Sequence, residues 1–213
     1  MAETGNIRVY GRNDEYQSIL EHEALILQVA VSILKPTKIF ESGTCNGYAT
    51  GHIVKGLELA GVEGAVIHTC DFIQHDLAQC NNIPQGIADV KFFWEPATVL
   101  LKRKLLKYDF AFLDGNHETE GVFREMEILG LDGDNPPTTF FHDVRPGSGD
   151  PLQSPYLAIV DFMEKKQCKR PFYRIGPGSL ATNMENVLEL KKHIEGIEIH
   201  PVGPWAFYPK AEE

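Results

Sequence analysis

Carboxylates and histidines directly follow two strand-like runs of this sequence. Asp114 and His117 come after the run 108–113, and His142 and Asp143 come after the run 138–141. Clustered carboxylates repel one another unless a cation lies among them. A divalent metal held by Asp114, His142 and Asp143 would satisfy them. Carboxylate ligands favour magnesium or manganese, and the histidine shifts the balance toward manganese or iron. Such a metal binds a hydroxyl and lowers its pKa, which favours an oxyanion nucleophile near neutral pH.

His117 could take the proton of that hydroxyl, because it lies three residues beyond Asp114 and histidine titrates near neutral pH. Each of these residues also has a structural interpretation. Asp114 could cap the following helix, His142 could be a hydrogen-bonded core histidine, and His117 could be a surface residue of a polar loop. Both interpretations stay open at this point.

A glycine loop follows an earlier strand-like run. Glu41 comes at the end of this run, and Gly43 and Gly47 bracket a turn before helix-forming residues. Cys45 stands where a dinucleotide-binding loop has its second glycine, so a pyrophosphate is not the expected ligand. A carboxylate at the strand end suits a cationic amino group or a hydroxyl, although an ordinary strand–helix turn is the alternative. Asp71 follows the next apolar run, at the position where such units present an acid to ribose hydroxyls.

Strands and helices alternate along most of the chain, which is typical of a parallel, doubly wound sheet. We therefore expect a single α/β domain over 1–213, Rossmann-like and mostly parallel, with about seven strands and an antiparallel C-terminal strand. It divides into a helical segment 1–35, a ligand-binding core 37–166 and C-terminal strands and helix 167–213. The expected strands are 37–40, 65–70, 90–94, 108–113, 138–141, 172–175, 197–200 and 205–208. The expected helices are 14–34, 48–60, 76–80, 98–106, 119–129, 156–166 and 184–194.

Ligands in such sheets bind beyond the carboxyl ends of the strands. The first, second, fourth and fifth expected strands therefore bring their terminal polar residues to one rim. Composition limits the partners. The formal net charge is −10 and the pI about 5.3, which disfavours nucleic acid. We find no apolar stretch of signal or membrane-span length and no disulfide framework among four cysteines, so we expect a cytoplasmic protein without a membrane partner. The apolar stripe of the first helix could serve a core or a homodimer contact.

Three motifs in order resemble a known family. The segment 39–50, IFESGTCNGYAT, resembles motif I of the class I S-adenosylmethionine-dependent methyltransferases, especially the metal-dependent O-methyltransferases. The segments 108–122, YDFAFLDGNHETEGV, and 140–144, FFHDV, look like paired motifs of the group that includes macrocin-type and catechol-type enzymes. This resemblance implies S-adenosylmethionine as cofactor, a divalent metal, and methylation of a hydroxyl on a small molecule such as a sugar, a phenol or a natural product.

The resemblance also implies roles for individual residues. The aminocarboxypropyl arm of the cofactor would lie against Glu41, Ser42, Gly43, Thr44, Cys45 and Gly47. Asp71 would hold the ribose, Phe72, Trp94 and Glu95 would lie at the adenine, and Asp114 would adjoin the cofactor. The metal would be held by Asp114, His142 and Asp143, and His117 with Asp114 would be catalytic. Val144 departs from catechol-type relatives, which carry an asparagine ligand there.

Two other functions fit the same residues. A hydrolase or isomerase could use the metal without the cofactor, and a non-catalytic subunit could bind the cofactor alone. The loop 145–151 and the segment 176–205 are expected to shape the acceptor pocket.

Overall fold

The computed structural model of the chain describes residues 19–73, 83, 86–145, 154–176 and 179–202. Within them, one sheet holds eight strands in the order β3-β2-β1-β4-β5-β7-β6-β8. Strands β1 to β5 pair in parallel, and β6, β7 and β8 form the antiparallel end of the sheet. The bounds are β1 (Lys38–Ser42), β2 (Ala65–Asp71), β3 (Ala88–Trp94), β4 (Phe110–Leu113), β5 (Thr138–Phe141), β6 (Phe172–Ile175), β7 (Leu180–Thr182) and β8 (Ile199–Val202). The expected Rossmann-like, mostly parallel architecture is confirmed.

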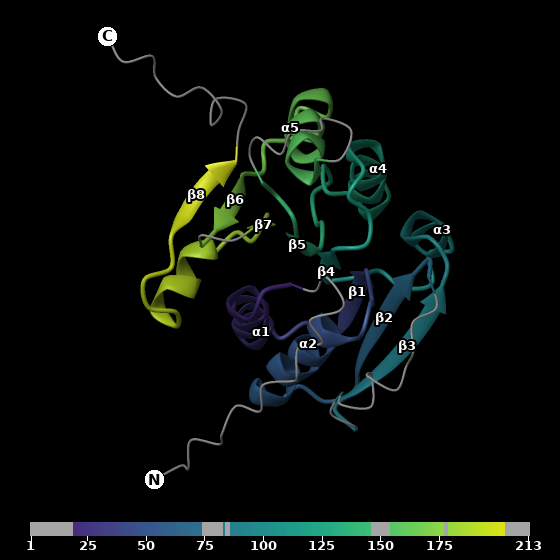
Figure 1. Cartoon of the computed structure of the whole chain (residues 1–213), viewed down its shortest axis with the longest axis vertical. Coiled ribbons are helices and arrows are strands. Elements are labelled where there is room, and N and C mark those ends of the chain that lie inside the picture. The colour runs from purple at the N-terminus through teal and green to yellow at the C-terminus, as the bar shows by residue number, and fades with distance from the viewer. Residues whose placement is uncertain (1–18, 74–82, 84–85, 146–153, 177–178, 203–213) are drawn as a thin grey trace.

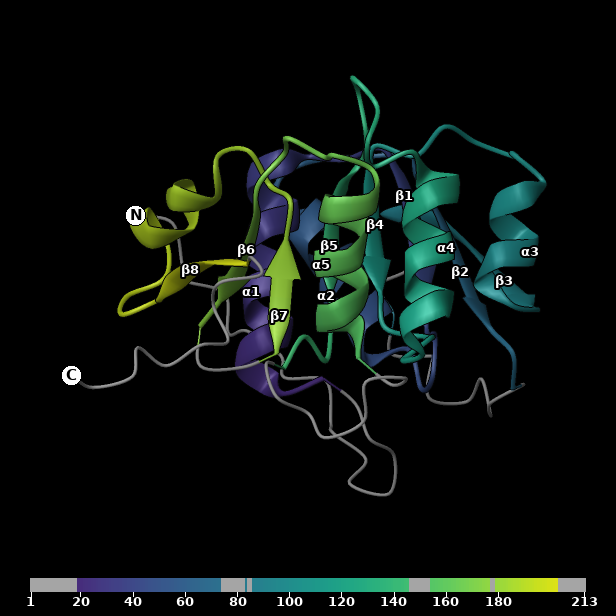
Figure 2. The same cartoon turned by 90° about the horizontal axis from the view of Figure 1, so that it is seen from above.

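Helices cover both faces of the sheet. They are α1 (Glu21–Leu34), α2 (Tyr48–Leu59), α3 (Ala97–Lys102), α4 (Thr119–Leu129) and α5 (Pro155–Lys165), with the 3₁₀ helix η2 (Val187–Lys192). Helices α1 and α2 lie on one face, and α3, α4 and α5 lie on the other (Figure 1). The turned view shows the same three layers, with α3, α4 and α5 in front of the sheet and α1 and α2 behind it (Figure 2).

The central strands are buried on both faces, which explains their continuous apolar runs. In β4, Phe110 and Phe112 join the hydrophobic cluster that contains α1 and α2, whereas Ala111 and Leu113 join the cluster on the side of α3, α4 and α5. Successive residues of a strand point to opposite faces, so one run of four apolar residues serves both clusters. The buried stripe of α1, which includes Leu27, belongs to the first cluster.

The register of the strands brings their carboxyl ends to one level. Ser42 of β1 pairs with Cys70 of β2 and with Leu113 of β4, and Leu113 pairs in turn with Phe141 of β5. The residues that follow these strands therefore share one edge of the sheet. This edge lies where the strand order changes direction around β1, which is the usual ligand site of such sheets.

Several expected elements differ from the structure. Strand β7 was not predicted, whereas the other seven strands of the described sheet correspond to expected strands. Helix α3 ends at Lys102 instead of residue 106, because Lys104 adopts a left-handed backbone with φ 51°. The expected helix 184–194 is the shorter η2, and the expected strand 197–200 is shifted to β8.

Some predictions fall outside the described residues. These are the start of the first helix before residue 19, the helix 76–80, most of the loop 145–151 and the strand 205–208. In the described part of the chain, no helix combines the length and the apolar composition that a membrane span requires.

Candidate functional site

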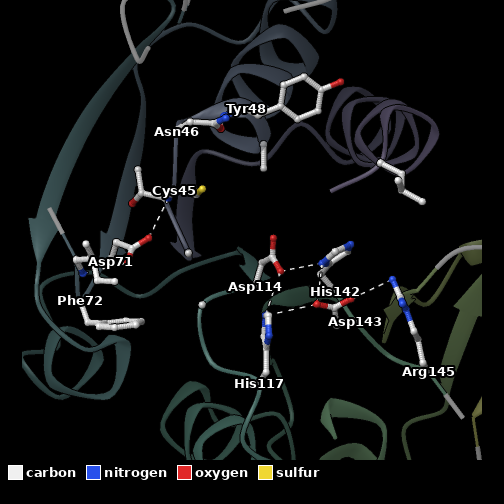
Figure 3. Close-up of a pocket in the computed structure, with 16 residues that line it drawn as sticks. Cys45, Asn46, Tyr48, Asp71, Phe72, Asp114, His117, His142, Asp143 and Arg145 are labelled. Carbon is white, nitrogen blue, oxygen red and sulfur yellow. Dashed lines mark hydrogen bonds and ion pairs between the residues drawn. The ribbon is translucent and has the colours of Figure 1, made fainter. Parts of the chain in front are cut away.

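A cavity of about 760 Å³ opens at the carboxyl ends of β1, β2, β4 and β5 (Figure 3). Its volume is in the roughly 300–1,000 Å³ range of small-ligand pockets. A second cavity of about 600 Å³ adjoins it and shares Gly43, Asp71, Phe72, Gly115 and His117 with it. The predicted residues that line the first cavity are Gly43, Thr44, Cys45, Asp71, Phe72, Asp114, His117, His142 and Asp143. Ser42 and Glu95 line the second cavity.

The loop after β1 passes very close to the loop after β4. A Cβ on Gly43 would lie 2.6 Å from the backbone carbon and oxygen of Asp114, and Gly43 also has a left-handed φ of 89°. Gly115 faces it, since a Cβ there would lie 2.7 Å from the backbone nitrogen of Gly43. Only residues without a side chain allow this approach. The glycine therefore brings the backbone of the first loop beside Asp114.

Asp71 holds the same loop from the end of β2. Its Oδ2 accepts a hydrogen bond from the Cys45 backbone N–H at 2.9 Å, and its Oδ1 accepts one from the Ile73 N–H at 3.1 Å. Cys45 has a left-handed φ of 45°, which turns its N–H toward the carboxylate. Figure 3 shows Asp71 and Phe72 on one side of the cavity and Asp114 on the other. Asp71 thus both shapes the loop and faces the cavity.

Three residues predicted to bind the cofactor do not line either cavity: Glu41, Gly47 and Trp94. Glu41 has no exposed surface, and its Oε2 accepts a hydrogen bond from the Thr50 hydroxyl at 2.6 Å. Burial raises the pKa of Glu41 to about 7, despite the opposing hydrogen bond from Thr50. Gly47 is the residue that precedes α2. Glu41 therefore lies in the core and holds the first turn of α2.

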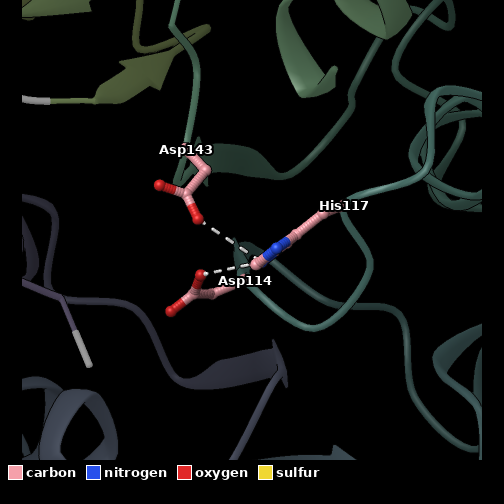
Figure 4. A group of neighbouring side chains, drawn as sticks. All are labelled: Asp114, His117 and Asp143. Carbon is pink, nitrogen blue, oxygen red and sulfur yellow. Dashed lines mark ion pairs between the residues drawn. The ribbon is translucent and has the colours of Figure 1, made fainter. Parts of the chain in front are cut away.

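The acids and histidines expected at the rim do converge. Nε2 of His117 lies 3.7 Å from Asp114 Oδ1 and 3.5 Å from Asp143 Oδ2 (Figure 4). One ligand atom from each of these residues lies within 4.8 Å of the others. This span is close to the roughly 4.2 Å between opposite ligands of an ion with bonds of about 2.1 Å. Asp114, His117 and Asp143 therefore fit a divalent cation.

His142, an expected metal ligand, lies among carboxylates, and its Nδ1 is 3.6 Å from Asp143 Oδ2. Its Nδ1 lies 2.8 Å from Asp114 Oδ1, and its Nε2 lies 3.0 Å from Glu23 Oε2. Both ring nitrogens thus face carboxylates, and His117 takes the place of His142 in the group of converging ligand atoms. Val144 is fully buried in the core, so the position of the relatives' asparagine offers no donor. Asp143, which has a left-handed φ of 55°, turns the chain between the cavity and the core at this point.

Charge interactions shift the pKa of both histidines. Burial would lower the pKa of His142, but hydrogen bonds to Asp114 and Glu23 outweigh it and raise this pKa to about 10. The neighbouring carboxylate of Asp114 raises the pKa of His117, and Asp143 adds to this effect against the cost of burial. Burial would raise the pKa of Glu23, yet hydrogen bonds from His142 and Ser179 lower it to about 2. The cluster therefore balances acidic against basic groups.

Sequence reasoning missed several residues of the site. Glu23 contacts His142 across 119 positions of the chain, so no local pattern could have indicated it. Arg145 was not missed: it begins the loop 145–151 that was expected at the acceptor pocket, and it lines the cavity with its guanidinium 3.4 Å from Asp143. Glu125 of α4 lines the second cavity and accepts a hydrogen bond from the Ser42 hydroxyl at 3.3 Å. A charged residue within the apolar stripe of α4 was the available signal for Glu125.

No protein-family model matches the sequence, and no curated protein sequence matches it. Its fold is similar to several solved structures. An O-methyltransferase from Bacillus cereus in complex with SAH aligns at 17% identity with a TM-score of 0.51, over 78% of this chain and 81% of that chain. An SAH-bound methyltransferase from Podospora anserina aligns at 17% identity with a TM-score of 0.53, over 79% of each chain. A putative caffeoyl-CoA O-methyltransferase from Staphylococcus aureus aligns at 12% identity with a TM-score of 0.51, over 79% of this chain and 85% of that chain. At these identities the similarity establishes the fold.

Proposed function

We propose that this chain is an S-adenosylmethionine-dependent methyltransferase that methylates a hydroxyl group of a small molecule. The observation that carries the proposal is the shared edge of the sheet, where the glycine loop, Asp71 and Asp114 line one cavity. The fold supports it, because the structures of similar fold include methyltransferases with SAH bound. The motifs that resemble this family supply the residues of that edge.

The cofactor would lie across both cavities. In this arrangement the backbone of Gly43 approaches the aminocarboxypropyl arm, and the Asp71 carboxylate accepts hydrogen bonds from the ribose hydroxyls. Phe72, which is 69% exposed, and Glu95 border the second cavity, where the adenine would lie. Glu95 is held by Arg103 at 2.6 Å, so its carboxylate is fixed at this wall.

His117 is the proposed general base. It lines both cavities and is half exposed, so a hydroxyl bound there can reach its Nε2. Asp114 and Asp143 stabilise the imidazolium that forms when His117 takes the proton. Alignment of the hydroxyl with the methyl group and removal of its proton supply most of the acceleration that methyl transfer requires.

A divalent metal would be held by Asp114, Asp143 and His117. When bound, it would supply Lewis acidity that lowers the pKa of the acceptor hydroxyl. Because Nε2 of His117 cannot serve both as metal ligand and as base at the same time, metal binding and proton transfer at this nitrogen exclude each other. We therefore expect that loss of the base His117 lowers the activity measured with a divalent ion less than it lowers the activity measured without one.

Calorimetry with S-adenosylmethionine and with SAH, its demethylated product, tests the first part of the proposal. We expect binding of both, and methyl transfer from labelled cofactor to at least one member of a panel of phenols, catechols and sugars. If neither nucleoside binds at millimolar concentration, the proposal is wrong. Turnover of a substrate without S-adenosylmethionine would instead favour the hydrolase or isomerase alternative.

Asp71 and Asp109 provide a matched pair of variants. Each carboxylate accepts two backbone N–H bonds, but Asp109 bonds Thr37 and Lys38 at the opposite end of the sheet. Asp71→Asn should weaken SAH binding, whereas Asp109→Asn should destabilise the fold without changing SAH affinity. If the two variants bind SAH with equal affinity, Asp71 makes no specific contribution to SAH binding.

A further inference from the structure

Glu23, in the first turn of α1, has no exposed surface, and hydrogen-bond donors surround its carboxylate. Oε2 accepts from the Leu20 backbone N–H at 3.0 Å and lies 3.0 Å from His142 Nε2. Oε1 accepts from the backbone N–H and from the hydroxyl of Ser179, at 2.6 and 3.0 Å. Helix capping needs only the Leu20 contact. The remaining contacts therefore require another explanation.

The ring of His142 connects Glu23 with the end of β4. Backbone N–H groups can only donate, so both oxygens of Glu23 act as acceptors, and the Nε2 that faces one of them carries a hydrogen. Nδ1 of the same ring lies 2.8 Å from Asp114 Oδ1. The side chain of His142 is 9% exposed, so water does not replace either contact freely. A buried ring thus bridges two carboxylates that come from α1 and from the site.

We propose that Glu23 is a positioning residue that, through the ring of His142, fixes the orientation of the Asp114 carboxylate in the cavity. This inference rests on the function proposed above. Asp114 belongs to the group with His117 and Asp143 that fits a cation. Residues that hydrogen-bond a ligating carboxylate fix its orientation, and their loss weakens metal affinity. Helix α1 therefore takes part in the site without touching the cation.

Glu23 could also act only as a structural link. Its contacts with Leu20 and Ser179 tie α1 to the residue before β7, and this link would stabilise the fold whatever Asp114 does. A structural link and a positioning residue differ in one respect. Only the positioning residue changes what Asp114 binds when its contact with His142 is impaired.

Glu23→Gln separates the two roles. The amide keeps the shape of the side chain, but its NH₂ group must face either the donors of Leu20 and His142 or those of Ser179. Gln28→Met is the matched control. Gln28 is buried on the same helix, and its Oε1 lies 2.9 Å from His52 Nδ1, away from the cavity. His142→Gln and the double variant Glu23→Gln/His142→Gln complete a double-mutant cycle.

Three measurements apply to each variant. Calorimetry measures SAH affinity and, in the presence of SAH, Mn²⁺ affinity. Spectra of protein labelled with ¹⁵N-histidine measure solvent exchange of the His142 ring N–H groups without metal. Thermal denaturation measures stability. Loss of a hydrogen bond to a charged group should accelerate ring N–H exchange in Glu23→Gln by about tenfold. Mn²⁺ affinity should fall about tenfold to a hundredfold, while SAH affinity stays unchanged.

The controls decide the interpretation. Gln28→Met should lose stability yet keep wild-type Mn²⁺ affinity and His142 exchange. In the double variant, the loss of Mn²⁺ affinity should equal that of His142→Gln alone, because Glu23 acts through this ring. Unchanged Mn²⁺ affinity in Glu23→Gln overturns the inference, as does unchanged ring exchange. If the wild type binds SAH but no Mn²⁺, the metal part of the proposed function fails, and ring exchange alone decides whether Glu23 holds His142 on Asp114. If the wild type binds no SAH, the proposed function itself fails.

Discussion

Replacement of Gly43 by alanine should destabilise the protein more than replacement of Gly61 or Gly115. An alanine at a left-handed φ costs about 1–2 kcal/mol, and overpacking a close contact costs about 1–3 kcal/mol. Gly43 has φ 89° and a Cβ position 2.6 Å from the backbone of Asp114, so both costs apply. The Gly43→Ala variant should therefore lose about 2–5 kcal/mol of unfolding free energy.

Two other glycines separate these costs. Gly61 has φ 66° with no atom within 4 Å of its Cβ position, and Gly115 has the close contact without a left-handed φ. Urea denaturation should give Gly61→Ala a loss of about 1 kcal/mol and Gly115→Ala a loss of about 1–3 kcal/mol. Calorimetry should show weakened SAH binding for Gly43→Ala and wild-type binding for Gly61→Ala. If Gly43→Ala is as stable as Gly61→Ala, the loop after β1 does not pass as close to Asp114 as described.

Three further predictions concern the charged residues. Burial raises the pKa of Glu125 from 4.5 to about 8, so the stability from its protonated form is complete below about pH 4.5 and is lost as the pH rises through 8. Between pH 6 and pH 9 the unfolding free energy of Glu125→Gln should therefore fall less than that of the wild type, as measured by denaturation. An equal fall in both proteins would contradict the raised pKa of Glu125. His117→Gln should lower kcat of metal-free turnover about a hundredfold to ten-thousandfold with unchanged SAH affinity, and a fully active variant would exclude His117 as the base. Asp143→Asn should lower Mn²⁺ affinity at least about tenfold and leave SAH affinity unchanged, which calorimetry of both ligands checks.

The sequence predicts the parallel half of the sheet well, because its information is local there. The apolar run of β4 is continuous, and Asp114 follows it directly, so the strand end and the polar residue are both visible in a few positions. Register then needs only the rule that parallel strands end at one edge. The antiparallel end is less visible, because β7 spans only Leu180–Thr182 and its three residues are all buried. Three buried residues carry no alternation from which a strand could be recognised.

The candidate site shows the same division between local and distant information. Convergence of Asp114, His117 and Asp143 follows from strand order, and sequence reasoning anticipated that these residues share a rim. The distinct placement of His142 does not follow, because it depends on Glu23, which is contributed by a helix 119 positions away. A histidine after a strand can face the cavity or a buried carboxylate with the same sequence around it.

The two histidines differ because each is held by a different kind of contact. His142 lies between carboxylates on both sides and is nearly buried, so its ring is fixed before any ligand arrives. His117 has a side chain that is 48% exposed, and its Nε2 lies beyond ordinary hydrogen-bond distance from both acids. A group that is to accept a proton or a cation must give up its resting contacts at little cost. His117 meets this requirement and His142 does not, so we propose His117 for the chemistry at this edge and His142 for the alignment of Asp114.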